Sequence, residues 1–203
     1  MTVLLEQQIA LEEQILYRNF DQIGLISSQT NTTQILQKAI EKSSNVCKDI
    51  IGKVPKVDII DKTKNNFPYV PSHLSCMLVE ILKNSMRSTI ESQKTKTELS
   101  KIKVEITDEF NEKEICIKIT DKGNGISKNS MKHIWSYLYT TIENTSTIDD
   151  ESLVYGSGSG LPVAKCYAQY FGGDLKIDSI EGKGTEVCLF LNRLVGANEN
   201  PLE

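Results

Sequence analysis

The sequence predicts an α+β fold, a two-layer sandwich in which helices cover one face of an antiparallel or mixed sheet. Apolar residues recur with a helical period up to residue 93, and with a period of two over residues 102–106 and 115–119. From residue 73 onward the elements read helix, hairpin, helix, polar loop, helix, hairpin. That order alternates too loosely for a doubly wound parallel sheet and favours helices grouped on one side.

The bulk composition is that of a soluble globular protein. The chain has 203 residues, of which 39% are hydrophobic and 25% charged. This length allows one substantial core with a helical appendage. The formal net charge of −4 offers no support for binding to nucleic acid or to an anionic membrane. No apolar run is long enough to cross a bilayer, so we expect no membrane span.

The five cysteines indicate reduced thiols in an intracellular compartment. They are scattered, odd in number and never in CxxC spacing, which argues against a disulfide framework or a zinc site. Four of them lie in segments with apolar periodicity, and we expect these to be small core residues. The cysteines are Cys47, Cys76, Cys116, Cys166 and Cys188.

The N-terminus shows no targeting signal. It lacks the basic flank and long apolar run of a signal peptide, and Glu6, Glu12 and Glu13 are untypical of a mitochondrial transit peptide. We therefore expect a targeting segment to be absent from this N-terminus or to have been removed before it.

The first half of the chain reads as mainly helical. Residues 4–20 form an amphipathic pattern, and residues 32–51 carry a second apolar stripe at helical spacing. Residues 56–60 resemble a short strand. Pro71 and Ser72 then signal the start of a third helix over residues 73–93.

The second half mixes strands and helices. Period-two runs predict hairpins, and a polar stretch without a firm period predicts a long loop. The predicted elements are strands 102–106 and 115–119, helix 130–140, loop 142–155, helix 160–171, and strands 174–179 and 185–191. We divide the chain into a helical segment over 1–52, a main domain over 53–195 and a disordered tail over 196–203.

The third helix carries a polar stripe with the groups that a metal–phosphate site needs. Glu80, Asn84 and Arg87 are spaced i, i+4 and i+7, so they share one face. An Asn oxygen can bind Mg²⁺, an Arg can hold phosphate oxygens, and a Glu can deprotonate a hydroxyl or a water. Alone, this stripe is as well explained by a solvated helix face. The opposite face carries core residues Leu74, Met77, Leu78, Ile81 and Leu82.

Two glycine-containing segments extend the pattern. Asp121 ends an apolar strand, and Gly123 and Gly125 behind it would let the backbone pass close to a flat ligand. The Asp121 carboxylate can accept a hydrogen bond from an exocyclic amine such as that of adenine. A simple turn rich in Asp, Gly and Asn is the alternative.

The second glycine-containing segment opens the helix that begins near residue 160. Its backbone N–H groups and the helix N-terminus suit phosphate, although the Lys-Ser/Thr of a Walker loop is missing and no strand precedes it. A flexible hinge is an alternative that is compatible with phosphate binding. The segment consists of Gly156, Ser157, Gly158, Ser159, Gly160 and Leu161. In this order and spacing, the three segments predict a site for ATP with Mg²⁺.

The three segments resemble the N, G1 and G2 boxes of the GHKL superfamily. The closest resemblance is to the mitochondrial pyruvate dehydrogenase kinases, including the branched-chain keto-acid dehydrogenase kinases. It covers nearly all of residues 53–194 and, more faintly, 22–47. The segments that carry it are YVPSHL (69–74), EILKNSMR (80–87), YLYTT (137–141), GSGLP (158–162), YAQYFGGDL (167–175) and EGKGT (181–185).

The resemblance implies a Bergerat-type α/β sandwich that binds ATP and Mg²⁺ in the mitochondrial matrix. It implies a protein-serine kinase that phosphorylates the E1α subunit of a 2-oxo-acid dehydrogenase complex and inactivates it. Carried over by motif, Glu80 is the general base, Asn84 holds Mg²⁺ and Arg87 supports the phosphates. Asp121 reads the adenine amine, with Thr185 beside it through a water. The other implied contacts are Thr140 and Thr141 along the nucleotide, Gly156 to Leu161 around the phosphates, and residues 142–155 as the ATP lid.

Two departures from the family are visible. The kinases carry a histidine one helical turn before the catalytic glutamate, where this chain has Cys76. A neutral thiol is a poor substitute, so we expect slower transfer. The family also has a large N-terminal helical bundle that docks on the lipoyl domain of E2. Only the last portion of this bundle fits into the first 50 residues, so binding to the lipoyl domain stays open. Whether the chain forms a homodimer also stays open.

Two other functions compete with the kinase. A histidine-kinase-type ATPase domain would share the nucleotide fold, but no histidine precedes His73, so the phospho-acceptor would belong to another chain. A non-catalytic ATP-binding interaction module is favoured by Cys76 and disfavoured by the presence of Glu80.

Overall fold

The computed structural model describes residues 22–23, 25–63, 67–93, 98–108, 113–137, 139 and 158–194. Several predictions therefore lie outside the described residues: the helix over 4–20, the loop over 142–155, the tail over 196–203, and the site residues Thr140, Thr141, Gly156 and Ser157. No helix within the described ranges is long and apolar enough to cross a membrane.

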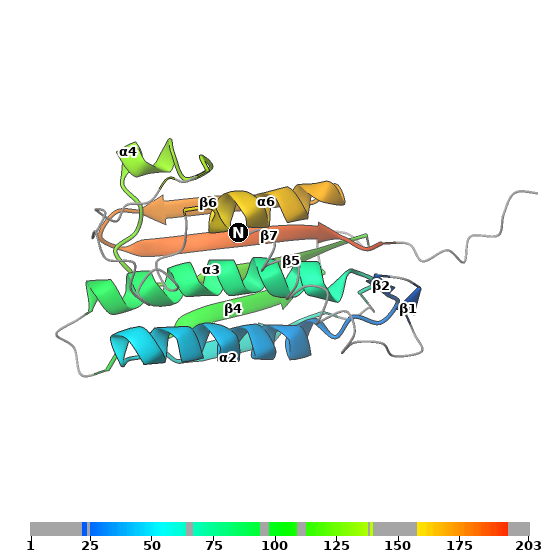
Figure 1. Cartoon of the computed structure of the whole chain (residues 1–203), viewed down its shortest axis with the longest axis horizontal. Coiled ribbons are helices and arrows are strands. Elements are labelled where there is room, and N and C mark those ends of the chain that lie inside the picture. Colours follow the sequence, from blue (N-terminus) through cyan, green and yellow to red (C-terminus); the bar gives the residue numbers. More distant parts are fainter. Residues whose placement is uncertain are drawn as a thin grey trace, which may run out of the picture.

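The chain folds into a mixed five-stranded sheet with helices on one face, as predicted (Figure 1). The strand order is β3-β4-β5-β7-β6; β3 and β4 are parallel and every other neighbouring pair is antiparallel. The strands are β3 (Val57–Asp61), β4 (Ile102–Thr107), β5 (Glu114–Thr120), β6 (Asp174–Ile180) and β7 (Gly184–Asn192).

Three long helices form the second layer: α2 (Thr32–Ile51), α3 (Pro71–Ser92) and α6 (Gly160–Tyr170). The central helix α3 contacts both α2 and α6 as well as β5 and β7. A small hairpin of β1 (Gln22–Ile23) and β2 (Ile26–Ser27) is joined to the domain through a bridge between Ser27 and Tyr69.

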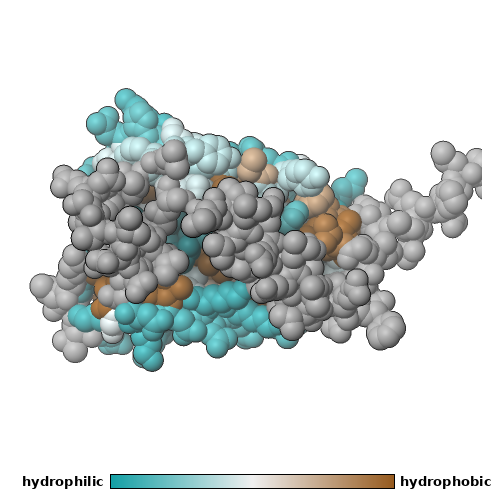
Figure 2. All heavy atoms as spheres, in the orientation of Figure 1, coloured by the Kyte–Doolittle hydropathy of each residue, from teal (hydrophilic) through white to brown (hydrophobic). Residues whose placement is uncertain are grey.

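One hydrophobic core lies between these layers. Alternate residues of the strands point toward the helices, and the predicted inner residues of α3 are fully buried. Burying each large apolar side chain contributes on the order of 1.5–3 kcal/mol before the cost of ordering the chain. The α2 stripe belongs to the same core, while its outer side is hydrophilic (Figure 2). The proposed division at residues 52–53 stays a prediction.

Both ends of α3 are tied down, which orients the polar stripe. Pro71 occupies the first turn, where its missing N–H has no helical partner to lose. After Ser92 the Gln93 side chain accepts from the backbone N–H of Ser100 at 2.8 Å and donates to the Lys122 carbonyl at 3.0 Å. The C-terminal end of α3 is thereby attached to the segment that follows β5.

The predicted helix over 130–140 is wrong in extent. The structure has a single helical turn, α4 (Lys128–Met131), capped by the Ser127 hydroxyl, which accepts from the Ser130 N–H at 3.1 Å. Hydrogen bonds between residues three apart, of the 3₁₀ type, follow; for example, the His133 N–H donates to the Ser130 carbonyl at 2.8 Å. Ile134 is buried in this turn segment, so its tertiary contact replaces helical continuation.

The expectation that four cysteines are core residues is also wrong. Only Cys47 and Cys116 are buried, and Cys166 is exposed. In α6 the buried residues are Pro162, Ala164 and Ala168, and Cys166, two positions from each alanine, lies on the side of the helix away from both alanines. Cys188 alternates with the buried residues of β7 and therefore lies on the sheet face away from the helices.

Candidate functional site

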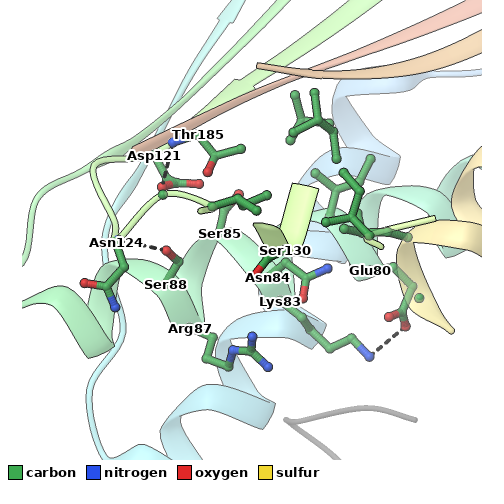
Figure 3. A pocket seen from close by; sticks show the side chains of 18 of the residues that line it. Glu80, Lys83, Asn84, Ser85, Arg87, Ser88, Asp121, Asn124, Ser130 and Thr185 are labelled. Atoms are coloured by element: carbon green, nitrogen blue, oxygen red, sulfur yellow. Dashed lines mark hydrogen bonds and ion pairs between the residues drawn. The ribbon is translucent and has the colours of Figure 1, made fainter. Parts of the chain in front are cut away.

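All three predicted segments line one cavity of about 390 Å³ (Figure 3). It is bordered by α3, the segment after β5, the start of α6, and residues of β6 and β7. This volume lies within the range of small-molecule sites. Sequence segments that are separated by up to about 80 residues therefore meet at a single place, as predicted.

The wall formed by α3 presents the polar stripe. Glu80, Asn84 and Arg87 all line the cavity, as expected from their spacing. The structure adds Lys83, whose Nζ lies 2.6 Å from Glu80 Oε1, and Glu91, whose Oε1 lies 3.7 Å from Arg87 Nε. The sequence analysis missed Lys83, although its i,i+3 spacing from Glu80 was a usable signal.

Asp121 is buried at the other end of the cavity. Its Oδ1 accepts the N–H of Gly123 at 2.9 Å and that of Thr185 at 3.3 Å, while its own N–H donates to the Thr185 carbonyl at 2.9 Å. Burial raises the pKa of the Asp121 carboxyl, and hydrogen bonds from Gly123, Ser85 and Thr185 oppose that rise. Ser85, like Lys83 and Glu91, was not predicted as a site residue.

Thr185 lies beside Asp121, as the resemblance implied. Its hydroxyl is 2.9 Å from the Ser179 hydroxyl, which also donates to the Gly184 carbonyl at 3.1 Å. Both Asp121 and Thr185 are buried, so this corner of the cavity is polar but shielded from bulk water.

The glycines after Asp121 have a packing role. A Cβ on Gly123 would lie 2.1 Å from Ser88 Oγ, and Gly125 adopts a φ of +66° with the Ile180 carbonyl 2.1 Å from its missing Cβ. The loop is thus pressed between α3 and the β6–β7 turn. Gly123 does not line the cavity, whereas Gly125 does.

The glycines at the start of α6 bring the helix close to α3. A Cβ on Gly160 would lie only 2.3 Å from Glu80 Oε2, so this glycine lets the carboxylate reach the helix N-terminus. Gly158, Gly160 and Leu161 line the cavity, and Ser159 is the N-cap residue of α6.

Apolar side chains complete the cavity and were not predicted as site residues. They come from five different segments and have no local signature that separates them from ordinary core positions. These residues are Ile81, Ile126, Ile134, Pro162, Ile177 and Val187, and they lie beside the predicted Leu161. Together with Asp121 they form an apolar slot with one buried acceptor.

Cys76 and the two histidines are not among the residues that line this cavity in the described part of the chain. His73 packs against Tyr167 and Phe171, with ring centroids 4.6 and 5.8 Å apart, and burial lowers the pKa of its imidazole. His133 is exposed. The effect of Cys76 on transfer stays a prediction.

The donor set fits a nucleotide with its metal. An apolar slot with a carboxylate suits a base that carries an amine, and Lys83 and Arg87 supply positive charge for phosphates. The described residues contain no cluster of three His, Cys, Asp or Glu that could hold a metal. Mg²⁺ that arrives on phosphates needs only one or two protein oxygens, and the Asn84 carboxamide can supply one.

Sequence comparisons agree with this arrangement. Residues 69–194 match the family described as histidine kinase-, DNA gyrase B-, and HSP90-like ATPase. The chain is 38% identical to the mitochondrial [pyruvate dehydrogenase (acetyl-transferring)] kinase of Schizosaccharomyces pombe, over 99% of this chain and 49% of the relative. It is 34% identical to the Arabidopsis thaliana kinase of the same name, over 89% of this chain and 50% of the relative.

The human mitochondrial [pyruvate dehydrogenase (acetyl-transferring)] kinase isozyme 4 is 32% identical, over 95% of this chain and 48% of the relative. The chain thus spans about half the length of the curated relatives it matches. The family match itself covers more than half of the chain and contains every segment that lines the cavity. With this match over residues 69–194 and with its helices on one face of a mixed sheet, the chain belongs to the family of histidine kinase-, DNA gyrase B- and HSP90-like ATPases.

Proposed function

We propose that this chain is the nucleotide-binding and catalytic part of an ATP-dependent protein-serine kinase. Its target is the E1α subunit of a mitochondrial 2-oxo-acid dehydrogenase complex, which phosphorylation inactivates. The observation that carries the proposal is that one cavity joins the Glu80–Asn84 wall to the buried Asp121. The similar proteins are all named pyruvate dehydrogenase kinases, which supports this choice of target.

We assign the adenine base of ATP to the buried corner of the cavity that Asp121 and Thr185 form. The apolar slot receives the flat base, and the Asp121 carboxylate accepts a hydrogen bond from its exocyclic amine. Thr185 contributes through a water. Backbone amides hold the carboxylate in place before the ligand arrives, so little ordering cost remains at binding.

We assign the phosphates of ATP to the part of the cavity between α3 and the start of α6. Asn84 provides an oxygen ligand for Mg²⁺, which when bound neutralises charge on the phosphate oxygens. Lys83 and Arg87 add positive charge from α3, and the glycine-rich start of α6 offers backbone N–H groups at a helix N-terminus. Thr140, Thr141 and the lid over 142–155 are proposed to complete the enclosure.

The transfer itself needs alignment and one proton acceptor. The serine Oγ of the target attacks the γ-phosphorus, so the new O–P bond forms as the bond to the β–γ bridging oxygen breaks. The serine proton passes to the Glu80 carboxylate, and ADP leaves with the electron pair of the broken bond. A positioned base of this kind contributes about 10²–10⁴ in rate, and the rest comes from alignment and charge neutralisation.

The proposal is tested by incubating the protein with radiolabelled ATP and the purified E1 subunits of the pyruvate and branched-chain complexes. We expect label on a serine of one E1α, and the comparison identifies which complex is the target. The Glu80→Gln variant keeps the shape of the side chain and should bind ATP with wild-type affinity but transfer no label. Tight ATP binding without label on either E1α would instead favour a non-catalytic interaction module, which the Cys76 substitution also favours.

A further inference from the structure

Both oxygens of the Glu80 carboxylate have a close neighbour in this structure. Oε1 lies 2.6 Å from the Lys83 ammonium, and Oε2 lies against the backbone of Gly160. The Glu80 and Lys83 side chains are only 25% and 16% exposed, so bulk water screens their attraction poorly. Figure 3 shows the pair at the cavity wall, with Asn84 and Arg87 on the same helix.

This contact opposes the role proposed for Glu80. The Lys83 ammonium lies at Oε1 and the backbone of Gly160 crowds Oε2. While the pair stands, little room is therefore left for a serine hydroxyl to reach the carboxylate within hydrogen-bond distance. The catalytic state requires Lys83 to have another partner.

A triphosphate supplies that partner at the same place. The attacking serine must lie within hydrogen-bond reach of Glu80 and next to the γ-phosphorus. An ammonium 2.6 Å from Glu80 is therefore close to the γ-phosphoryl group when ATP fills the cavity. Lysine is a compact charge on a flexible stem, so it can change partners without moving α3.

We infer that Lys83 exchanges partners with the state of the nucleotide. It pairs with Glu80 when the cavity holds no γ-phosphate, and it pairs with the γ-phosphate when a triphosphate binds. Glu80 is thereby released to accept a proton only when a phosphoryl group is present to transfer. This inference rests on the proposed function and assigns Lys83 a positioning role that acts through Glu80.

The exchange is tested with a zero-length carbodiimide crosslinker, which condenses a carboxylate and an amine in contact with loss of water. The Glu80–Lys83 crosslink is measured by peptide mass spectrometry without nucleotide, with ADP and Mg²⁺, and with a non-hydrolysable ATP analogue and Mg²⁺. We expect similar yields in the first two conditions and a loss of about tenfold or more in the third, the scale of a hydrogen bond between charged groups.

The chain contains matched internal controls. Lys101 and Asp58 are 2.9 Å apart, and Lys103 and Glu105 are 3.1 Å apart, and none of these residues lines the cavity. Their crosslinks should not respond to nucleotide. An unchanged Glu80–Lys83 yield, with the analogue shown to be bound by calorimetry, overturns the exchange and leaves the nucleotide site standing. Failure of the analogue to bind overturns both the exchange and the proposed function.

Two variants separate this role from a structural one. Lys83→Met keeps the length of the side chain but removes its charge, and we expect it to reduce affinity for ATP about tenfold while affinity for ADP stays unchanged. Lys83→Arg keeps the charge and should retain the preference for ATP. Equal loss of affinity for both nucleotides in Lys83→Met would point to a structural contact and contradict the exchange.

Discussion

Replacing Asp121 with asparagine tests the nucleotide site most directly, because the structure shows which hydrogen bonds survive the change. A carboxylate has about four acceptor positions. Gly123, Thr185 and Ser85 occupy three of them. The remaining position is available to the exocyclic amine of adenine. Asparagine keeps one oxygen for the two backbone amides but places an NH₂ group where the second oxygen was. This NH₂ group and the exocyclic amine of adenine are both donors, so they cannot form a hydrogen bond.

The expected loss of ATP affinity follows from the loss of this hydrogen bond to adenine. A hydrogen bond to a charged acceptor is worth about 1.5–3 kcal/mol, which corresponds to roughly 10- to 150-fold weaker ATP binding in Asp121→Asn. Inosine triphosphate carries a carbonyl oxygen where ATP carries the amine, and the new NH₂ can donate to it. We therefore expect the preference for ATP over inosine triphosphate to fall or reverse.

Isothermal titration calorimetry with both nucleotides and Mg²⁺ measures the two affinities. Asp58→Asn is the matched control, because Asp58 is an exposed carboxylate on β3 outside the cavity and should change neither affinity. Thermal unfolding of Asp121→Asn should remain close to that of the wild type, because the bonds to Gly123 and Thr185 are kept. An unchanged ATP affinity together with an unchanged nucleotide preference would refute the assignment of the base to this corner.

Asn84→Ala should remove the Mg²⁺-dependent part of ATP affinity, measured by calorimetry with and without the metal; equal Mg²⁺ dependence in both proteins would contradict the metal assignment. Gly160→Ala should displace the Glu80 carboxylate, since the new Cβ would lie 2.3 Å from Oε2, and reduce phosphate transfer far more than ATP binding. Burial lowers the pKa of His73 below its ordinary 6.5, so the unfolded chain binds more protons and stability falls as pH drops below about 6.5. His73→Phe should flatten this fall in melting temperature, and an equally steep fall would exclude His73 as its source.

The wall formed by α3 was predictable because helix geometry converts spacing directly into a shared face. The i, i+4, i+7 relation placed Glu80, Asn84 and Arg87 together, and the apolar residues between them indicated which side is buried. The hairpins were predictable for the same reason, since alternation alone distinguishes the two faces of a strand. These are local properties that hold whatever the rest of the chain does.

The errors came from positions where tertiary contacts outweigh local preference. The helical pattern over 130–140 continued in sequence, but α4 ends after one turn, where i→i+3 hydrogen bonds take over and Ile134 is buried. Cys166 resembled a core residue because its neighbours are apolar, yet α6 buries its alanines instead. A short amphipathic helix has too few turns to decide its own length or contact face.

Spacing along the chain was thus enough to define the fold class, the two faces of α3 and the residue types of a nucleotide site. Only the folded chain decides which of those residues meet. Asp121 and Thr185 are neighbours because β5 pairs with β7 in a register that sets Thr120 opposite Glu186. Glu80 lies against Gly160 because α6 packs on α3. Contacts between distant segments depend on strand register and helix packing, which are properties of the whole core.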